Sequence, residues 1–109
     1  MAHFLTDKRT MEVLPYEVDF SPVLSDSDTV LDPVKTTIKI VDSAGKDQTG
    51  SILQKATFSG TVITLVLKDG IDGEDYTIYI TGQGDVSYLT NQPVRVVELR
   101  VRDTIVGNL

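Results

Sequence analysis

The stretch Thr61-Val62-Ile63-Thr64-Leu65-Val66-Leu67-Lys68 is the strongest strand signal in this sequence of 109 residues. Ile63, Leu65 and Leu67 fall on one face of an extended chain, and the residues between them fall on the other. Alternation with a period of two, in a run rich in β-branched side chains, is typical of a strand with one face in a core. No segment of the sequence holds a helical period over three turns. The pattern therefore predicts an all-β protein.

Weaker strand signals lie on both sides of this stretch and are separated by turn residues. They occupy Tyr16–Phe20, Thr36–Val41, Ser51–Phe58, Tyr76–Thr81 and Val94–Arg102. In the third of these runs we expect Ile52, Ala56 and Phe58 to point inward, with Gln54 as an exception. Clusters of Asp, Gly and Ser recur at intervals of about 8–12 residues, which is the spacing of turns in antiparallel sandwiches. The sequence predicts an antiparallel two-sheet sandwich of about seven strands.

One domain accounts for the chain, because 109 residues fall in the usual range of about 100–150 residues for a single domain. We expect an N-terminal arm at 1–15, the sandwich at 16–103 and a C-terminal tail at 104–109. Neither end has strong strand character, yet both carry apolar residues, Phe4 and Leu5 among them. Two interpretations stay open for these ends: frayed termini of an isolated domain, or arms that order against a neighbouring subunit.

The approach to the strand at Tyr76–Thr81 favours an immunoglobulin-like form of the sandwich. Gly73-Glu74-Asp75-Tyr76 resembles the corner before strand F of that fold, where a tyrosine hydroxyl bonds back to upstream main chain. We expect the Tyr76 ring to fill the sheet edge and its hydroxyl to bind a turn carbonyl. The hallmarks of antibody domains are missing, since the sequence has no Cys and no Trp. The prediction is a sandwich of immunoglobulin type only.

Composition argues against several classes of function. The formal net charge is −6 and the sequence pI is about 4.5, whereas binding to phosphate backbones needs clustered Lys and Arg, so nucleic acid is not an expected partner. The absence of cysteine removes disulfides and thiolate metal sites. No apolar run approaches the roughly 18 residues of a membrane span, and the start lacks a signal-peptide pattern. We therefore expect no membrane partner and assembly in the cytoplasm.

The sequence offers no constellation that points to catalysis or to a cofactor. His3, the only histidine, lies in the expected arm without partner ligands. Asp69–Asp75 is the densest acidic loop, and Asp26, Asp28 and Asp32 form a second one. Calcium needs about six to eight oxygen ligands, and Asp and Gly at these places are better explained by turn geometry. No serine or threonine has a candidate base. We expect no enzyme activity, no metal and no cofactor.

The opening of the chain narrows the function. The run Asp7-Lys8-Arg9-Thr10-Met11-Glu12-Val13-Leu14-Pro15-Tyr16-Glu17-Val18-Asp19-Phe20-Ser21 resembles the start of a small family of accessory proteins from tailed-phage structural gene clusters. Members of that family begin with the pattern K-D-P-x-E-x-L-x-Y-x-x-D-W-S. Asp28-Thr29-Val30, Gly73-x-x-Tyr76 and the final strand also match loosely. The chain departs from the pattern at Arg9-Thr10, where the family has Asp-Pro, and at Phe20, where it has Trp.

This resemblance implies a non-enzymatic virion component, assembled in the host cytoplasm, that works through contacts with other virion proteins and with copies of itself. The implied partners are the major capsid protein or the connector and neck proteins. Decoration of the capsid surface, attachment at the neck or collar, and anchoring of fibres all stay open. The rival hypothesis is a carbohydrate-binding or adhesion sandwich, with or without calcium. Tyr79 and Tyr88 are its candidate exposed rings.

The end of the chain carries the candidate docking residues. In Val94–Arg102 we expect Val97, Leu99 and Val101 to face the core. An exposed edge strand is a template for pairing with another chain unless charge blunts it. We expect this last strand to be such an edge. Two interpretations of its arginines stay open: solubility and cross-strand pairing, or blunting of the edge together with docking onto an acidic partner surface. The predicted partner-binding residues are Arg95, Arg100, Arg102, Ile105, Val106 and Leu109.

Overall fold

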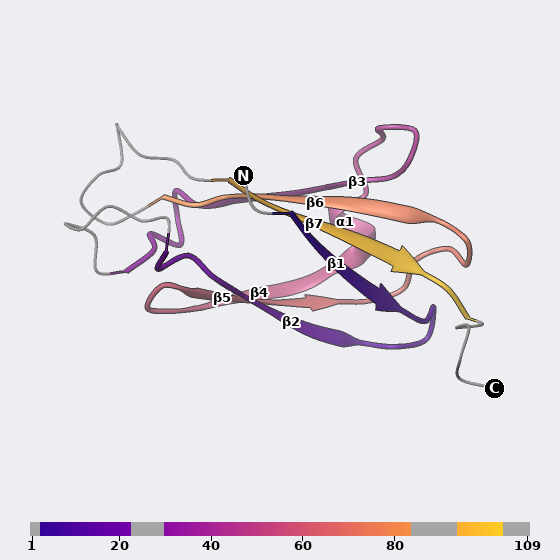
Figure 1. The fold of residues 1–109 in the computed structure, drawn as a ribbon, viewed down its shortest axis with the longest axis horizontal. Helices are drawn as coiled ribbons and strands as arrows, with labels where there is room; N and C mark the ends of the chain where they lie inside the picture. The colour runs from indigo at the N-terminus through magenta and orange to yellow at the C-terminus, as the bar shows by residue number, and fades with distance from the viewer. Residues whose placement is uncertain (1–2, 23–29, 84–93, 104–109) are drawn as a thin grey trace.

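The structure, a computed structural model, describes residues 3–22, 30–83 and 94–103 (Figure 1). The described residues form seven strands and one short helix. The strands are β1 (His3–Lys8), β2 (Leu14–Asp19), β3 (Thr37–Val41), β4 (Leu53–Ser59), β5 (Val62–Leu67), β6 (Asp75–Thr81) and β7 (Val94–Val101), and the helix is α1 (Thr49–Ile52). The prediction of an all-β protein is confirmed.

The strands form two layers, as Figure 1 shows. One sheet has four strands in the order β1-β7-β6-β3, and the other has three in the order β2-β5-β4. All strand pairs are antiparallel except β1 with β7, which run parallel. The two-sheet sandwich expected from the sequence is therefore confirmed, with β5 at the centre of the smaller sheet.

The core lies between the two sheets and is built from the inward faces of alternating strands. The side chains of Ile63, Leu65 and Leu67 on β5 are fully buried, and so are Val97, Leu99 and Val101 on β7. Both sets were expected inside from their period of two. Burial of these branched side chains stabilises the fold by about 1.5–3 kcal/mol each, the usual value for a fully buried Val, Leu or Ile.

The segment before the first expected strand differs from its prediction. The sequence indicated no strand there, yet His3–Lys8 forms β1 and pairs in parallel with β7, with Phe4 opposite Val97 and Lys8 opposite Val101. The strand at Tyr16 also starts earlier, at Leu14. β1 ends in the polar run Thr6-Asp7-Lys8, so its period of two is not marked by apolar residues. Only the pairing with β7 makes it a strand.

The region around Gln54 shows why that residue broke the expected alternation. Ser51 and Ile52 belong to α1, so the strand begins only at Leu53. The register of β4 against β5 shifts between Leu53 and Lys55, which leaves Gln54 as the extra residue of a β-bulge. Ile52 is buried, and Ala56 and Phe58 are partly buried against the core, as expected.

Tyr76 is buried, with 3% of its surface exposed, and its hydroxyl bonds to upstream main chain. The bond has the opposite sense to the one expected. The hydroxyl oxygen accepts the N–H of Ile71 at 3.1 Å instead of donating to a turn carbonyl. Just before Ile71, the chain turns at Asp69, with φ of +52°, and Gly70, with φ of +102°, and the N–H of Ile71 meets the Tyr76 hydroxyl.

Candidate interaction surface

The last strand, β7, is not an edge of its sheet. It lies between β1 and β6 and pairs with both along its length. The expectation that this strand is an exposed edge is therefore wrong. The physical reason is β1, whose main-chain groups bond to the side of β7 that was expected to be exposed.

Arg95 points into the sandwich and not toward solvent. Its exposed fraction is 7%, and a terminal nitrogen donates to the main-chain carbonyl of Asp19 at 3.5 Å. The guanidinium carbon lies 6.0 Å from the centre of the Phe20 ring. A cation at about this distance from an aromatic ring is attracted to it. Arg95 thus ties β7 of one sheet to the end of β2 in the other.

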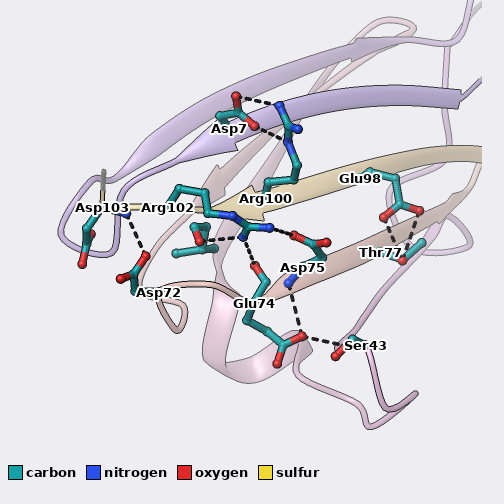
Figure 2. A network of polar contacts seen from close by, with 11 residues as sticks. Asp7, Ser43, Asp72, Glu74, Asp75, Thr77, Glu98, Arg100, Arg102 and Asp103 are labelled. Carbon is teal, nitrogen blue, oxygen red and sulfur yellow. Dashed lines mark hydrogen bonds and ion pairs between the residues drawn. The ribbon is translucent and has the colours of Figure 1, made fainter. Parts of the chain in front are cut away.

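Arg100 and Arg102 lie at the surface but pair within the chain, as Figure 2 shows. Arg100 binds both carboxylate oxygens of Asp7, at 2.7 and 3.0 Å. This hydrogen bonding and the charge of Asp7 raise the pKa of Arg100. Arg102 donates to Asp75 at 2.7 Å and also to the carbonyls of Glu74 and Val101. Arg100 therefore joins β7 to β1, and Arg102 joins the residue after β7 to β6, so the two arginines do not form a free basic patch.

The remaining predicted docking residues, Ile105, Val106 and Leu109, lie outside the described residues, as do Asp26, Asp28 and Tyr88. His3 lies in β1, and only its main chain is described. Tyr79 has an exposed fraction of 41%, on the outer face of β6.

In the acidic loop Asp69–Asp75, the carboxylates of Asp72, Glu74 and Asp75 accept hydrogen bonds from other parts of the protein (Figure 2). A carboxylate oxygen of Asp72 accepts the N–H of Asp103 at 2.9 Å, and the carboxylate of Glu74 accepts the N–H of Ser43 at 3.3 Å. The carboxylate of Asp75 accepts a hydrogen bond from Arg102. No group of three or more His, Cys, Asp or Glu side chains in the described part of the chain is arranged to hold a metal ion. The loop fastens neighbouring segments together.

Lys8 connects the loop that follows β1 to the loop between β5 and β6. It is fully buried on the inward face of β1, and its ammonium group donates to the main-chain carbonyls of Arg9, Thr10 and Asp69. Burial lowers the pKa of Lys8, and the nearby carboxylates of Glu12, Asp69 and Asp103 act in the opposite direction. A buried ammonium is tolerated only when its protons are bonded, so Lys8 holds the β1–β2 loop against the β5–β6 loop.

Asp103 makes a second connection at the same place. One of its carboxylate oxygens accepts the N–H of Thr10 at 2.9 Å and the hydroxyl of Thr10 at 2.8 Å. These two bonds lower the pKa of Asp103. The main-chain N–H of Arg102 donates to the carbonyl of Lys8 at 2.8 Å. The end of the described chain is therefore fixed to the loop that follows β1.

We call this end of the sandwich the loop end, made of residues 9–13, 68–74 and 102–103. It presents three large apolar side chains to solvent: Met11 is 95% exposed, Val13 54% and Ile71 67%. A pocket of about 360 Å³ lies beside Ile71, between the β5–β6 loop and α1. Exposed apolar surface that is contiguous often marks a protein–protein contact, so the loop end is a candidate interaction surface.

The opposite end of the sandwich, which we call the turn end, is made of residues 30–36, 59–61 and 82–83. Asp32 shapes it, because its carboxylate accepts the N–H groups of Val34 and Lys35. The N–H of Asp32 donates to the carbonyl of Gln83 at 2.7 Å. Val34 is 88% exposed and Val30 40%. The two ends of the sandwich therefore each carry exposed apolar side chains.

Sequence reasoning missed Lys8 and Asp103 as organising residues. Lys8 lay within the expected arm at 1–15, and Asp103 was the last residue of the expected sandwich. One signal was present: Lys8 stands two positions after Thr6, at the spacing of residues that share one face of a strand. An ionisable residue at an inward position of a strand needs bonded partners, but the sequence does not show which loops supply them.

In the described residues, no helix is long and apolar enough to cross a membrane.

A search of curated proteins finds no match to the chain. A comparison with protein-family models matches residues 8–83 to the family described as Podophage GP4 fiber-tail adaptor protein gp77. The match covers well over half of the chain, including six of the strands in part or whole and the whole acidic loop.

Proposed function

Because the chain belongs to the family of podophage GP4 fiber-tail adaptor proteins, we propose that it joins a fibre to the tail of a phage particle by protein–protein contacts alone. The resemblance to accessory structural proteins of tailed phages is thereby confirmed at the level of the family. The chain is a virion structural protein of this family, and its partners are other virion proteins. The proposal goes further by assigning the adaptor role to particular surfaces.

The observation that carries the proposal is the loop end. Lys8 and Asp103 fasten three segments to one another there, and Met11, Val13 and Ile71 stand exposed on that frame. Ordering a loop on binding opposes association, so a loop that is already cross-linked binds more tightly for the same contacts. The apolar tail residues Ile105, Val106 and Leu109 follow directly after Asp103 in the chain, and we assign them to the same contact.

An adaptor needs two surfaces, and the sandwich offers one at each end. The turn end presents Val34 on a turn that Asp32 shapes, far from Met11 along the strands. We assign one end to the tail and the other to the fibre. A sandwich whose rigid strands separate two binding ends transmits a fixed distance and orientation between its partners.

The family description favours fibre attachment over the other virion roles suggested by the sequence, namely decoration of the capsid and a collar at the neck. Carbohydrate binding has less support. Aromatic platforms for sugars stack several rings, and in the described part of the chain Tyr79 is the sole aromatic among the exposed large side chains.

We also infer that the sandwich is of the immunoglobulin type. In that fold strands B, E and D form one sheet and C, F and G the other. The order β2-β5-β4 and the order β3-β6-β7 match these two sets when the strands are counted along the chain. Tyr76 at the start of β6 then takes the place of the corner tyrosine on strand F.

The experiment replaces apolar side chains at one end at a time in phage that carry the variant gene. Met11→Asp with Ile71→Asp alters the loop end, and Val34→Asp alters the turn end. Purified particles are analysed for the amounts of this protein and of fibre by quantitative mass spectrometry. We expect one variant to remain on the particle without fibre, and the other to be lost together with the fibre.

Lys39→Asp provides the matched control, because Lys39 is exposed on the outer face of β3, away from both ends. It should leave particle composition unchanged. Circular dichroism of each purified variant checks that the sandwich is folded. Full fibre content in both end variants would show that neither end joins the partners.

A further inference from the structure

The two sheets have four edge strands, and they differ in how their outward main-chain groups are covered. The edges are β1 and β3 in the larger sheet and β2 and β4 in the smaller one. Free N–H and C=O groups on an edge are a template for another strand, and proteins usually blunt them. A comparison of the edges therefore shows where a strand can be added.

The edge of β2 is blunted. Phe20 N–H donates to the carbonyl of Thr61, so the even-numbered residues of β2 bond to β5 and the odd-numbered ones face outward. Pro15 has no N–H, and the outward carbonyl of Asp19 accepts Arg95. Only Glu17 keeps both outward groups for another strand, too few for a ladder.

The edge of β3 is partly covered by the chain that follows it. The carbonyl of Ile40 accepts the N–H of Gln48, and the N–H of Ile40 donates to the hydroxyl of Thr49.

The other edge of the larger sheet is β1. The inward side chains of β1 that the structure describes, Thr6 and Lys8, are polar and offer little apolar surface to an added strand. Neither edge of the larger sheet therefore suits strand addition as β4 does.

Within residues 3–22, 30–83 and 94–103, no main-chain or side-chain group is recorded as bonding to the outer edge of β4. The N–H of Lys68 donates to the carbonyl of Ile52. The main-chain groups of the even-numbered residues of β5 therefore bond to β4. In β4 the residues that pair with them are Lys55, Thr57 and Ser59. The N–H and C=O groups of Ala56 and Phe58 consequently point away from β5. The side chains of Ala56 and Phe58 are only partly buried against the core.

We propose that a second copy of this chain pairs with this edge, β4 against β4 in antiparallel orientation about a two-fold axis at Thr57. In this register Ala56 and Phe58 of one copy lie opposite Phe58 and Ala56 of the other, so their outward groups form hydrogen-bonded pairs. A small side chain then faces a large one. Lys55 lies opposite Ser59, so no like charges oppose each other.

The pairing joins the two smaller sheets into one and covers the apolar side chains left open beside β4. A contact of the same patch on both copies is an isologous interface, which closes at the dimer. The β4 edge is separate from the loop end and the turn end, so the dimer keeps both ends available. The proposal does not depend on which virion partner each end binds.

The test is sedimentation equilibrium of the full chain over concentrations up to about 0.5 mM, the range of weak association. Thr57 is exposed, and at the two-fold axis it meets its own copy. Thr57→Glu and Thr57→Lys each place like charges there, and each should weaken self-association about tenfold or more. An equimolar mixture of the two variants should form a one-to-one heterodimer, because the charges then attract.

Ala56→Pro is the second variant, since it removes an N–H that does not bond to β5. It should abolish dimerisation, with circular dichroism confirming the fold. Glu17→Lys, on the outer edge strand of the same sheet, is the control and should associate like the unmodified chain. A chain that is monomeric at every concentration would overturn the proposal. Equally, unchanged association of Thr57→Glu would place any dimer contact elsewhere.

Discussion

The ammonium group of Lys8 donates a hydrogen bond to the main-chain carbonyl of Asp69, 61 positions further along the chain. This bond crosses from the first strand of one sheet to the loop that leaves the central strand of the other. With the two carbonyls that follow Lys8, it closes the loop end around a buried charge. The surface that we assign to a virion partner therefore rests on a residue that no partner can contact.

Lys8→Met tests this role. The methionine keeps most of the apolar contacts, but it leaves the carbonyl of Asp69 without its donor. We expect a loss of about 1–3 kcal/mol in the free energy of unfolding, the usual penalty for a buried polar group that loses its partner. Urea denaturation measures it. Lys46→Met at an exposed position is the control and should change stability little. Equal stability of both variants would contradict the role of Lys8.

Gly70→Ala tests the close approach between the β5–β6 loop and β7. A Cβ at Gly70 would lie 2.8 Å from a methyl carbon of Val101, in a backbone with φ of +102°. Gly73 in the same loop has φ of +89°, but a Cβ there meets nothing within 4 Å. Gly73→Ala should therefore lose only about 1 kcal/mol from backbone strain, and Gly70→Ala about 1–3 kcal/mol more from crowding. Thermal unfolding of the pair gives the difference, and equal losses would argue against crowding.

Asp103 predicts a pH dependence with a definite sign. Hydrogen bonds from Thr10 lower its pKa in the folded state below the ordinary value of 3.8. Its stabilising contribution is then complete above pH 3.8 and is lost as the pH falls through the lowered value. Asp19, Asp42 and Asp47 have lowered pKa values and act in the same direction. The melting temperature should fall in acid.

Asp103→Asn separates this carboxylate from the others. The amide oxygen still accepts the Thr10 bonds but does not titrate, so the fall of the melting temperature below pH 3.8 should become shallower than in the unmodified chain. Differential scanning calorimetry between about pH 2.5 and 7 covers the window. A slope identical to that of the unmodified chain would rule out Asp103 as a contributor.

A chain that ends at Asp103 tests the apolar tail. The bonds that fix the loop end involve residues up to Asp103, so removal of Thr104–Leu109 should leave the melting temperature unchanged. The shortened chain should nevertheless fail to join particles, because Ile105, Val106 and Leu109 are assigned to the contact. Occupancy on purified particles is the measurement. Incorporation equal to that of the full chain would remove the tail from the interface.

The sequence predicted the central strand β5 well, but it did not predict the edge strand β1 or the ion pairs of the arginines near the end of the chain. β5 was recognised because Ile63, Leu65 and Leu67 alternate with residues that face away, and this pattern is local. β1 was missed because its described inward residues include Thr6 and Lys8, which carry no apolar signal. Arg100 and Arg102 were assigned to docking on a partner, whereas they pair with Asp7 and Asp75 from distant parts of the chain.

The sequence by itself determined the class of fold, the buried faces of its strongest strands and the family likeness, since each depends on residues near one another along the chain. Only the tertiary structure decided that β7 is an inner strand, that Lys8 closes the loop end and that β4 keeps an open edge. These features depend on which strands become neighbours and which main-chain groups remain uncovered. Strand order arises from packing between the two sheets, so local periodicity cannot reveal it.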